Sequence, residues 1–353
     1  MTGLPLGDGD PFADVIGQER AVDLLRAAIP NPVHAYLFVG PRGSGKRRAA
    51  LRMAGELVGA DEDRERNRTL AAREEHPDVV IIEPLGPKFL KEDAEAVIVE
   101  ASRSPSEAGR KVLILNRFED ADAEIAARLL KTIEEPPEST MFIMLTEHVP
   151  PGHITVASRS VNVAFPAVTE SKIADALVAR GIDGELALLT ARGACGDVNR
   201  AELLLTDEAF VARRDLWWSV PERIDGTGYA VSEIAAEIMA VVDEAQAPLD
   251  ERHAQEVAAM DEKEELTGAR GSGRSAMTAR HKREVNLHKA DEWRMGLSTL
   301  AHRYREALVA GSPETDVFAT LTDASTALTR NPNADLWLTN TLLSLPAISG
   351  AKS

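Results

Sequence analysis

The feature that most constrains the fold is a glycine loop between a short apolar run and a predicted helix. Residues 37–47 read L-F-V-G-P-R-G-S-G-K-R, which fits the phosphate-binding pattern G-x-x-x-x-G-K-[ST] except at the last position. Glycines let the backbone turn so that successive N–H groups point inward and surround an anion. The following helix presents the positive end of its dipole to the same place. The stretch therefore predicts a P-loop that follows a buried strand.

The loop residues that we expect to surround a phosphate are Gly40, Pro41, Gly43, Ser44, Gly45 and Lys46. Lys46 would reach the terminal phosphates of a nucleotide. The motif needs a serine or threonine for magnesium at the next position, which holds Arg47. A guanidinium only donates hydrogen bonds and does not ligate a cation. Two interpretations stay open: a loop that still binds a nucleotide, and a glycine turn without a ligand.

The second motif of an ATPase, which binds magnesium and activates water, is expected at the end of the predicted strand 111–115. A P-loop ATPase holds an aspartate there for magnesium, often beside a glutamate that activates water. Here the positions hold Asn116 and Arg117, a poor ligand for a hard cation and a side chain that cannot act as a base. Glu119 and Asp120 follow, but they come two or more residues past the strand end, so we expect their carboxylates to lie elsewhere. The sequence predicts little or no ATP hydrolysis by this chain alone.

Strand and helix patterns alternate through the first half of the chain. Short apolar runs, each typical of a buried strand, occupy residues 37–39, 79–82, 111–115, 141–145 and 161–165. Helical patterns separate them, so we expect a parallel sheet covered by helices. After Pro166 the pattern is helical throughout, with one long charge-rich segment at 233–260. The fold class is α/β followed by all-α, with domains predicted at 1–166, 167–207 and 208–353.

Composition narrows the classes of protein and of site. The net charge of −17 means that the chain as a whole repels nucleic acid. A single cysteine, Cys195, excludes a disulfide framework within the chain and a multi-thiolate zinc site. No run approaches the roughly 18 apolar residues of a membrane span, and the N-terminus lacks the pattern of a signal peptide. We expect a soluble, cytoplasmic protein.

Four stretches occur in a specific order. They are F-x-D-V-I-G-Q at 12–18, H-A-Y-L-F-V-G-P-R-G-S-G-K at 34–46, L-L-K-T-I-E-E-P-P at 129–137 and S-R-S at 158–160. In this combination the chain resembles the clamp-loader branch of the AAA+ ATPases, most strongly over 12–165. The resemblance implies an AAA+ P-loop domain, a small helical lid domain and a C-terminal helical collar through which subunits assemble.

The resemblance also implies roles for three side chains. Arg159 matches the arginine of the family's S-R-C motif, which projects into the ATP site of the neighbouring subunit and is worth about 10³–10⁵ in rate. The alternative for Arg159 is a solvated surface arginine. Thr146 matches the first sensor of the family, although a threonine at a strand end needs no function. Arg200 matches the second sensor on the lid, and a vestigial or helix-surface role is the alternative.

Broken hydrolysis motifs beside a retained arginine imply a stator, a non-catalytic subunit of the DNA polymerase III clamp loader. Its partners would be the gamma/tau and delta subunits, with the sliding clamp and primer-template DNA reached through the complex. No cofactor is required, although ATP or ADP bound without hydrolysis stays compatible with the loop. Many bacterial relatives carry a cysteine-rich zinc module after the P-loop helix, and residues 61–75 contain no cysteine, so no zinc is expected.

Two other functions stay open at this point. One is an active clamp-loader ATPase, in which Lys46 binds ATP and Glu119 or Asp120 is recruited as a ligand. The other is a regulatory or repair-linked AAA+ protein outside replication.

The basic segment 270–289 raises a separate DNA-binding hypothesis. It carries Arg270, Arg274, Arg280, Lys282, Arg283 and Lys289 against one acid, Glu284. No aromatic residue lies among them, so a solvated helix pair or flexible loop is favoured over a DNA contact.

Overall fold

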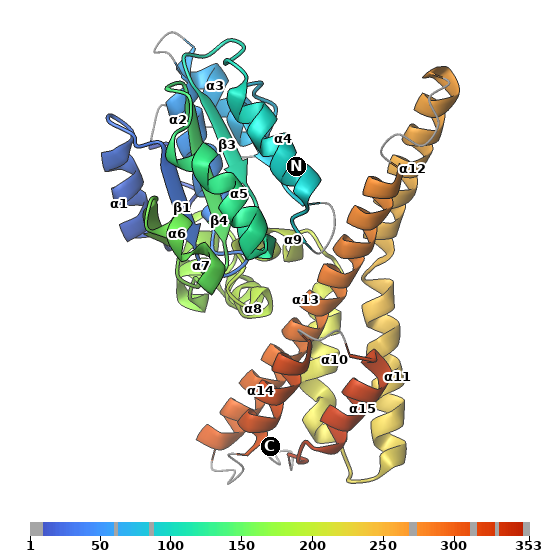
Figure 1. Ribbon diagram of the computed structural model, residues 1–353. Coiled ribbons are helices and arrows are strands. Elements are labelled where there is room, and N and C mark those ends of the chain that lie inside the picture. The colour runs from blue at the N-terminus through green and yellow to red at the C-terminus, as the bar shows by residue number, and fades with distance from the viewer. Residues whose placement is uncertain are drawn as a thin grey trace. The chain divides into compact units, whose positions relative to one another are not determined.

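The computed structural model describes residues 10–59, 63–84, 88–267, 274–310, 316–328 and 332–348 (Figure 1). The chain divides into two compact units. The first comprises the chain up to Gly184 together with Gly196–Arg200, and the second comprises Glu185–Cys195 and the chain from Ala201 onward. This division into two units does not test the predicted boundaries at 166/167 and 207/208, which stay a prediction.

A five-stranded parallel sheet forms the centre of the first unit (Figure 1). Its strands are β1 (Ala35–Val39), β2 (Val79–Ile82), β3 (Lys111–Leu115), β4 (Thr140–Thr146) and β5 (Val161–Ala164), and their order is β2-β3-β4-β1-β5. All four neighbouring pairs are parallel. Each strand overlaps an apolar run of the sequence, so the predicted parallel sheet is confirmed.

Helices cover both faces of this sheet because successive strand residues point to opposite sides. Tyr36 and Phe38 lie in one core and Ala35 and Leu37 in the other. The first core is closed by α1 (Glu19–Ala28), α2 (Lys46–Val58) and α3 (Arg64–Ala72). The second is closed by α4 (Lys91–Ser102), α5 (Ala123–Glu134) and α6 (Ile154–Ala157). Two short 3₁₀ turns, η1 (Phe118–Asp120) and η2 (Pro151–His153), and α7 (Glu170–Ala179) complete the description of this part.

The remaining elements are helices, as the sequence predicts. They are α8 (Gly184–Ala194), α9 (Val198–Leu204), α10 (Phe210–Arg223), α11 (Gly228–Glu244), α12 (Ala247–Thr267), α13 (Arg274–Val309), α14 (Val317–Leu328) and α15 (Ala334–Leu343). The charge-rich segment 233–260 is two helices rather than one continuous element. Pro248 is the second residue of α12, a position where its missing N–H and fixed φ suit the first turn of a new helix.

Aromatic side chains form the centre of the second unit. The Trp293 ring packs edge-on against Trp217 and Trp337, with ring centroids 6.2 and 5.3 Å away. Gly296 of α13 lies directly against the Trp217 ring, because a Cβ placed on Gly296 would come within 2.2 Å of it. The close approach of α10 and α13 therefore requires the absence of a side chain at residue 296.

We predict that Gly296→Ala destabilises the second unit by about 1–3 kcal/mol, because the added methyl overpacks the Trp217 ring. All four tryptophans of the chain lie in this unit, so urea unfolding followed by tryptophan fluorescence reports on it directly. Gly228→Ala is the matched control, since a Cβ there meets nothing within 4 Å. Equal unfolding midpoints for the two variants would contradict the packing argument.

In the first unit a buried aspartate organises the loop that precedes β3. The Asp78 carboxylate accepts hydrogen bonds from the backbone N–H groups of Ser106, Glu107 and Ala108 at 2.5, 2.9 and 2.8 Å. Burial by itself raises the pKa of Asp78, but these three amides outweigh it and hold the pKa below the ordinary value of 3.8. The folded state therefore favours the ionised form.

Because the folded pKa is depressed, the stabilisation from Asp78 is fully present above the ordinary aspartate pKa and is lost as pH falls through the folded value. We predict that Asp78→Asn lowers the free energy of unfolding at pH 7 by about 1–3 kcal/mol, and that the difference from wild type shrinks in acid. Scanning calorimetry at pH 7 and pH 3 measures this. The control, Asp175→Asn, changes an exposed carboxylate of α7 and is expected to leave both transitions in place.

Candidate functional site

The glycine loop connects β1 to α2, as the motif predicts. Gly43 and Gly45 have φ values of +74° and +88°, in the left-handed region that glycine adopts without strain. Gly40 has no room for a side chain, because a Cβ there would lie 1.9 Å from the carbonyl oxygen of Phe165. Packing and backbone geometry by themselves therefore account for the glycines of the loop.

Lys46 is folded over its own loop. Its Nζ donates to the carbonyl oxygens of Gly40 at 2.8 Å and Pro41 at 3.1 Å. Burial lowers the pKa of Lys46, although the nearby acids Glu147, Glu119 and Asp197 act in the opposite direction. In this conformation the ammonium group that would bind a phosphate closes the loop instead.

Arg47 and Asn116, the two residues that replace magnesium ligands, meet at one carboxylate. Glu83 Oε2 accepts from Arg47 Nη1 at 3.0 Å and from Asn116 Nδ2 at 2.9 Å. Arg47 also donates from Nε and Nη2 to the two carboxylate oxygens of Glu74, at 2.9 and 2.8 Å. Burial alone lowers the pKa of Arg47, but Glu74 and Glu83 reverse this and raise it. A fixed positive charge thus compensates these acids.

This arrangement does not fit a magnesium nucleotide. Magnesium needs oxygen ligands in an octahedral arrangement and usually one or two carboxylates. The carboxylate of Glu83 is already bound by a guanidinium and an amide, and both of these groups are donors here. Among the residues described by the structure, no group of three or more His, Cys, Asp or Glu side chains is arranged to hold a metal ion.

Glu119 follows β3 in the chain. The expectation that its carboxylate lies away from the magnesium-ligand position stays a prediction. Glu119 interacts electrostatically with Lys46 and with the Thr146 side chain, and burial raises its pKa. Arg117 adopts a left-handed conformation (φ 55°), and the 3₁₀ turn η1 follows it. The Asp120 carboxylate pairs with Arg117.

The segment 197–200 packs against the glycine loop. The N–H of Val198 donates to the Gly43 carbonyl at 3.2 Å, and Arg48 donates to Asn199 Oδ1 at 3.0 Å. A Cβ on Gly43 would come within 2.1 Å of the Asp197 carboxyl carbon. An acidic side chain of the same unit therefore covers the loop that the motif assigns to a phosphate.

The two sensor-like residues have structural partners. The Thr146 hydroxyl donates to the carbonyl of His148 at the end of β4. Arg200 is only 8% exposed, and its backbone N–H donates to Asp197 Oδ1 at 3.0 Å. These positions neither require nor exclude a sensor role, which stays a prediction for both residues.

Arg159 follows the one-turn helix α6 and is partly exposed, with 44% of its side chain accessible. Its Nη1 donates to the Thr155 carbonyl at 3.2 Å and to Ser158 Oγ at 3.3 Å. Its Nε pairs with the carboxylate of Glu134, the last residue of α5. The guanidinium lies outside the core and is restrained by three groups of its own chain.

Comparison with known proteins agrees with these motifs. Residues 17–169 match the family model described as "DNA polymerase III, delta subunit". The chain is 31% identical to DNA polymerase III subunit delta' of Bacillus subtilis over 54% of this chain and 60% of that protein. It is 34% identical to the delta' subunit of Pseudomonas aeruginosa, over 44% and 50%. It is 30% identical to the tau subunit of B. subtilis, over 58% and 38%.

The chain is similar to clamp-loader subunits of DNA polymerase III. It spans 60% or less of the length of each of these three relatives, so the resemblance to DNA polymerase III subunits covers only part of them. Both delta' and tau subunits occur among the matches. Sequence identity alone therefore does not distinguish a delta'-type from a tau-type subunit.

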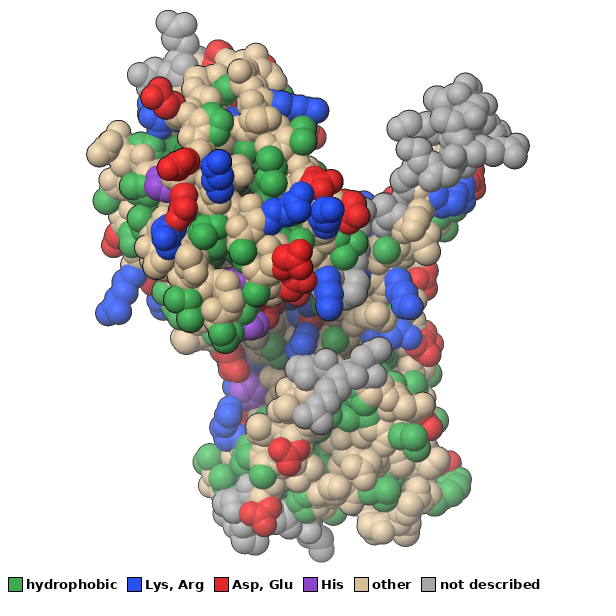
Figure 2. All heavy atoms as spheres, viewed as in Figure 1, with side chains coloured by type: hydrophobic (Ala, Val, Ile, Leu, Met, Phe, Trp, Pro, Cys, Tyr) green, Lys and Arg blue, Asp and Glu red, His purple; other side chains and the backbone are tan. Residues whose placement is uncertain are grey.

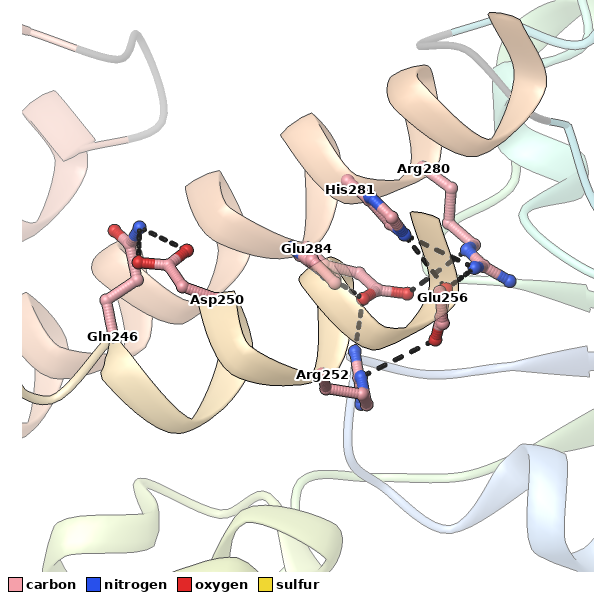
Figure 3. A network of polar contacts seen from close by, with 8 residues as sticks. Gln246, Asp250, Arg252, Glu256, Arg280, His281 and Glu284 are labelled. Atoms are coloured by element: carbon pink, nitrogen blue, oxygen red, sulfur yellow. Dashed lines mark hydrogen bonds and ion pairs between the residues drawn. The ribbon is translucent and has the colours of Figure 1, made fainter. Parts of the chain in front are cut away.

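The basic residues between 274 and 289 are largely engaged in ion pairs. Arg274 pairs with Asp261, Arg280 with Glu256, and Lys289 with Asp243 at 2.9 Å. Figure 3 shows the central part, in which Arg280 and His281 of α13 meet Glu256 of the adjoining helix α12. The described part of the segment lies on α13, which pairs with α12 in agreement with the helix-pair interpretation. Arg270 lies outside the described residues.

Basic and acidic side chains also lie near one another on the surface. On the face drawn in Figure 2, acidic and basic side chains are interspersed over the part of the chain that the structure describes. None of the described helices is long and apolar enough to cross a membrane.

Sequence reasoning missed Glu83, Glu74, Asp197 and Glu134, the acidic partners at the loop and at Arg159. Only Glu83 carried a readable signal. It directly follows β2, and the carboxyl ends of parallel strands share one edge of the sheet, where α/β proteins place their sites. The other three come from helices or loops whose approach is fixed by tertiary packing.

We predict that Gly43→Ala detaches the segment 197–200 from the loop, because the new methyl group would collide with Asp197 and the left-handed φ would be strained. Hydrogen exchange followed by mass spectrometry should show faster exchange at 197–204 than in wild type. The control is Gly184→Ala, where a Cβ meets nothing within 4 Å. Unchanged protection in Gly43→Ala would show that the contact does not hold the segment.

Proposed function

We propose that this chain is a delta'-type stator of a DNA polymerase III clamp loader. In this role it hydrolyses no ATP itself and supplies Arg159 to the ATP site of a neighbouring motor subunit. It would act in the cytoplasm, with gamma/tau and delta subunits as partners, and would reach the sliding clamp and primer-template DNA through the complex.

The observation that carries this proposal is the shared carboxylate of Glu83. Arg47 and Asn116 are separate departures from the ATPase motifs, and they contact the same acceptor. Loss of the magnesium ligands is therefore compensated by a stable polar cluster. The P-loop would then serve packing, with Lys46 bound to loop carbonyls and Asp197 against Gly43. No cofactor and no zinc are needed for this role.

The exposed Arg159 supports the second half of the proposal. An arginine that stabilises the charge of a transferring phosphate in another subunit must project from the surface of its own. The Arg159 side chain is 44% exposed and lies in the S-R-S stretch between α6 and β5.

One observation favours a second candidate, an active gamma/tau-type motor subunit. Glu119 lies near Lys46 and Thr146, and its Oε2 is buried without a hydrogen-bond partner among the described residues. A carboxylate in that place could take over the task of the missing acids. Arg47 argues against an active motor subunit, because it occupies the position of a magnesium ligand and its positive charge pairs with Glu83 next to the loop.

Steady-state ATP hydrolysis by the chain alone and by the complex reconstituted with its gamma/tau and delta partners tests the proposal. We expect no turnover by the chain alone. In the complex, Arg159→Ala should abolish hydrolysis at the one site that it serves, since such a finger is worth about 10³–10⁵ there. The total rate would fall accordingly while the complex stays assembled on gel filtration.

The matched control is Arg128→Ala. Arg128 lies on α5, is 42% exposed and also pairs with a glutamate, Glu95. It should leave the rate unchanged. Turnover by the chain alone that is lost in Glu119→Gln would establish the motor candidate instead, and equal rates for Arg159→Ala and wild-type complexes would overturn the trans role.

A further inference from the structure

The contact between Arg159 and Glu134 joins two of the sequence stretches, 158–160 and 129–137. Glu134 is the last residue of α5, and its carboxylate pairs with the Nε of Arg159, 25 residues further along the chain. The pair is half-exposed, with 44% of the arginine side chain and 31% of the glutamate side chain accessible. A charged group intended for a phosphate is thus already neutralised by a carboxylate of its own chain.

We infer that Glu134 is a latch residue: it holds Arg159 as an internal counter-ion until a phosphate of the neighbouring subunit displaces the carboxylate. This inference rests on the proposed function of Arg159. Glu134 touches neither nucleotide nor reacting atoms in this scheme, so it acts only through the orientation and charge of Arg159.

The chemistry of the guanidinium makes the exchange feasible. Arginine binds carboxylates and phosphates with the same planar set of N–H donors, so one anion can replace the other without a change of protonation. The contacts within the chain use Nε and Nη1, which leaves Nη2 as the terminal nitrogen that these contacts do not use. A phosphate could engage this nitrogen first and then displace Glu134.

Glu134 has room to move away from Arg159 after the exchange. Glu134 also lines a cavity of about 330 Å³ that includes Arg110 and Glu135. When Arg159 leaves, the carboxylate can turn toward this cavity rather than stay next to the incoming phosphate. Exposed ion pairs are weak, so the latch can be opened by a competing phosphate.

The first test uses the isolated chain and does not depend on any partner. Phenylglyoxal modifies accessible, unpaired guanidinium groups, and mass spectrometry measures the rate at Arg159. We expect Glu134→Gln, which keeps the shape and removes the charge, to raise this rate by up to about fivefold, the range of an exposed pair. Glu135→Gln removes a charge from the next residue of the same cavity and should leave the rate unchanged. An unchanged rate in Glu134→Gln would overturn the latch.

The second test measures ATP hydrolysis by the reconstituted complex. We expect Glu134→Gln to raise the Arg159-dependent rate, to have no effect in an Arg159→Ala background, and to differ less from wild type at high salt, which screens the pair. A lower rate in Glu134→Gln would contradict the latch. If Arg159→Ala itself has no effect while Glu134→Gln still increases labelling, the proposed trans role fails and the latch contact stands.

Discussion

The carboxylate of Glu83 is the constraint on which the rest of the candidate site depends. Removing one partner from a partly buried charged cluster leaves the other charges uncompensated, which is far more costly than the small net gain from forming it. Arg47, Asn116, Glu74 and Glu83 therefore have to be understood as a unit. A single reversion such as Arg47→Thr would leave two acids facing each other and would not recreate a magnesium site.

The P-loop is accordingly a case in which a binding motif and its packing requirements can be separated. Its glycines are needed for φ values above zero and for close approach of Phe165 and Asp197. Those demands persist whether or not a phosphate binds, so the motif can outlast the activity. Arg159 can likewise be retained whether or not it acts on a phosphate, because a partly exposed arginine makes few demands on packing. Its partner Glu134 is the last residue of α5.

The two units were predictable to different degrees. The strands of the first unit could be located because each is an apolar run of the right length, and alternating patterns predicted a parallel sheet. The bend at 245–246 between α11 and α12 was missed, because charge-rich composition continues across it and only Pro248 marks the new helix. The left-handed conformation of Arg117, just before the turn η1, could not be inferred from residue type.

By itself the sequence determined the fold class and the P-loop pattern, with Arg47 and Asn116 at the positions where magnesium ligands are expected, because these depend on residue type and local spacing. It also singled out Arg159 through the S-R-S stretch, with a trans role that stays a proposal. Only the tertiary structure decided which acids compensate the substituted positions, that segment 197–200 covers Gly43, and that Glu134 holds Arg159. Such pairs join residues far apart in the chain, and their contacts exist only after the helices have packed on the sheet.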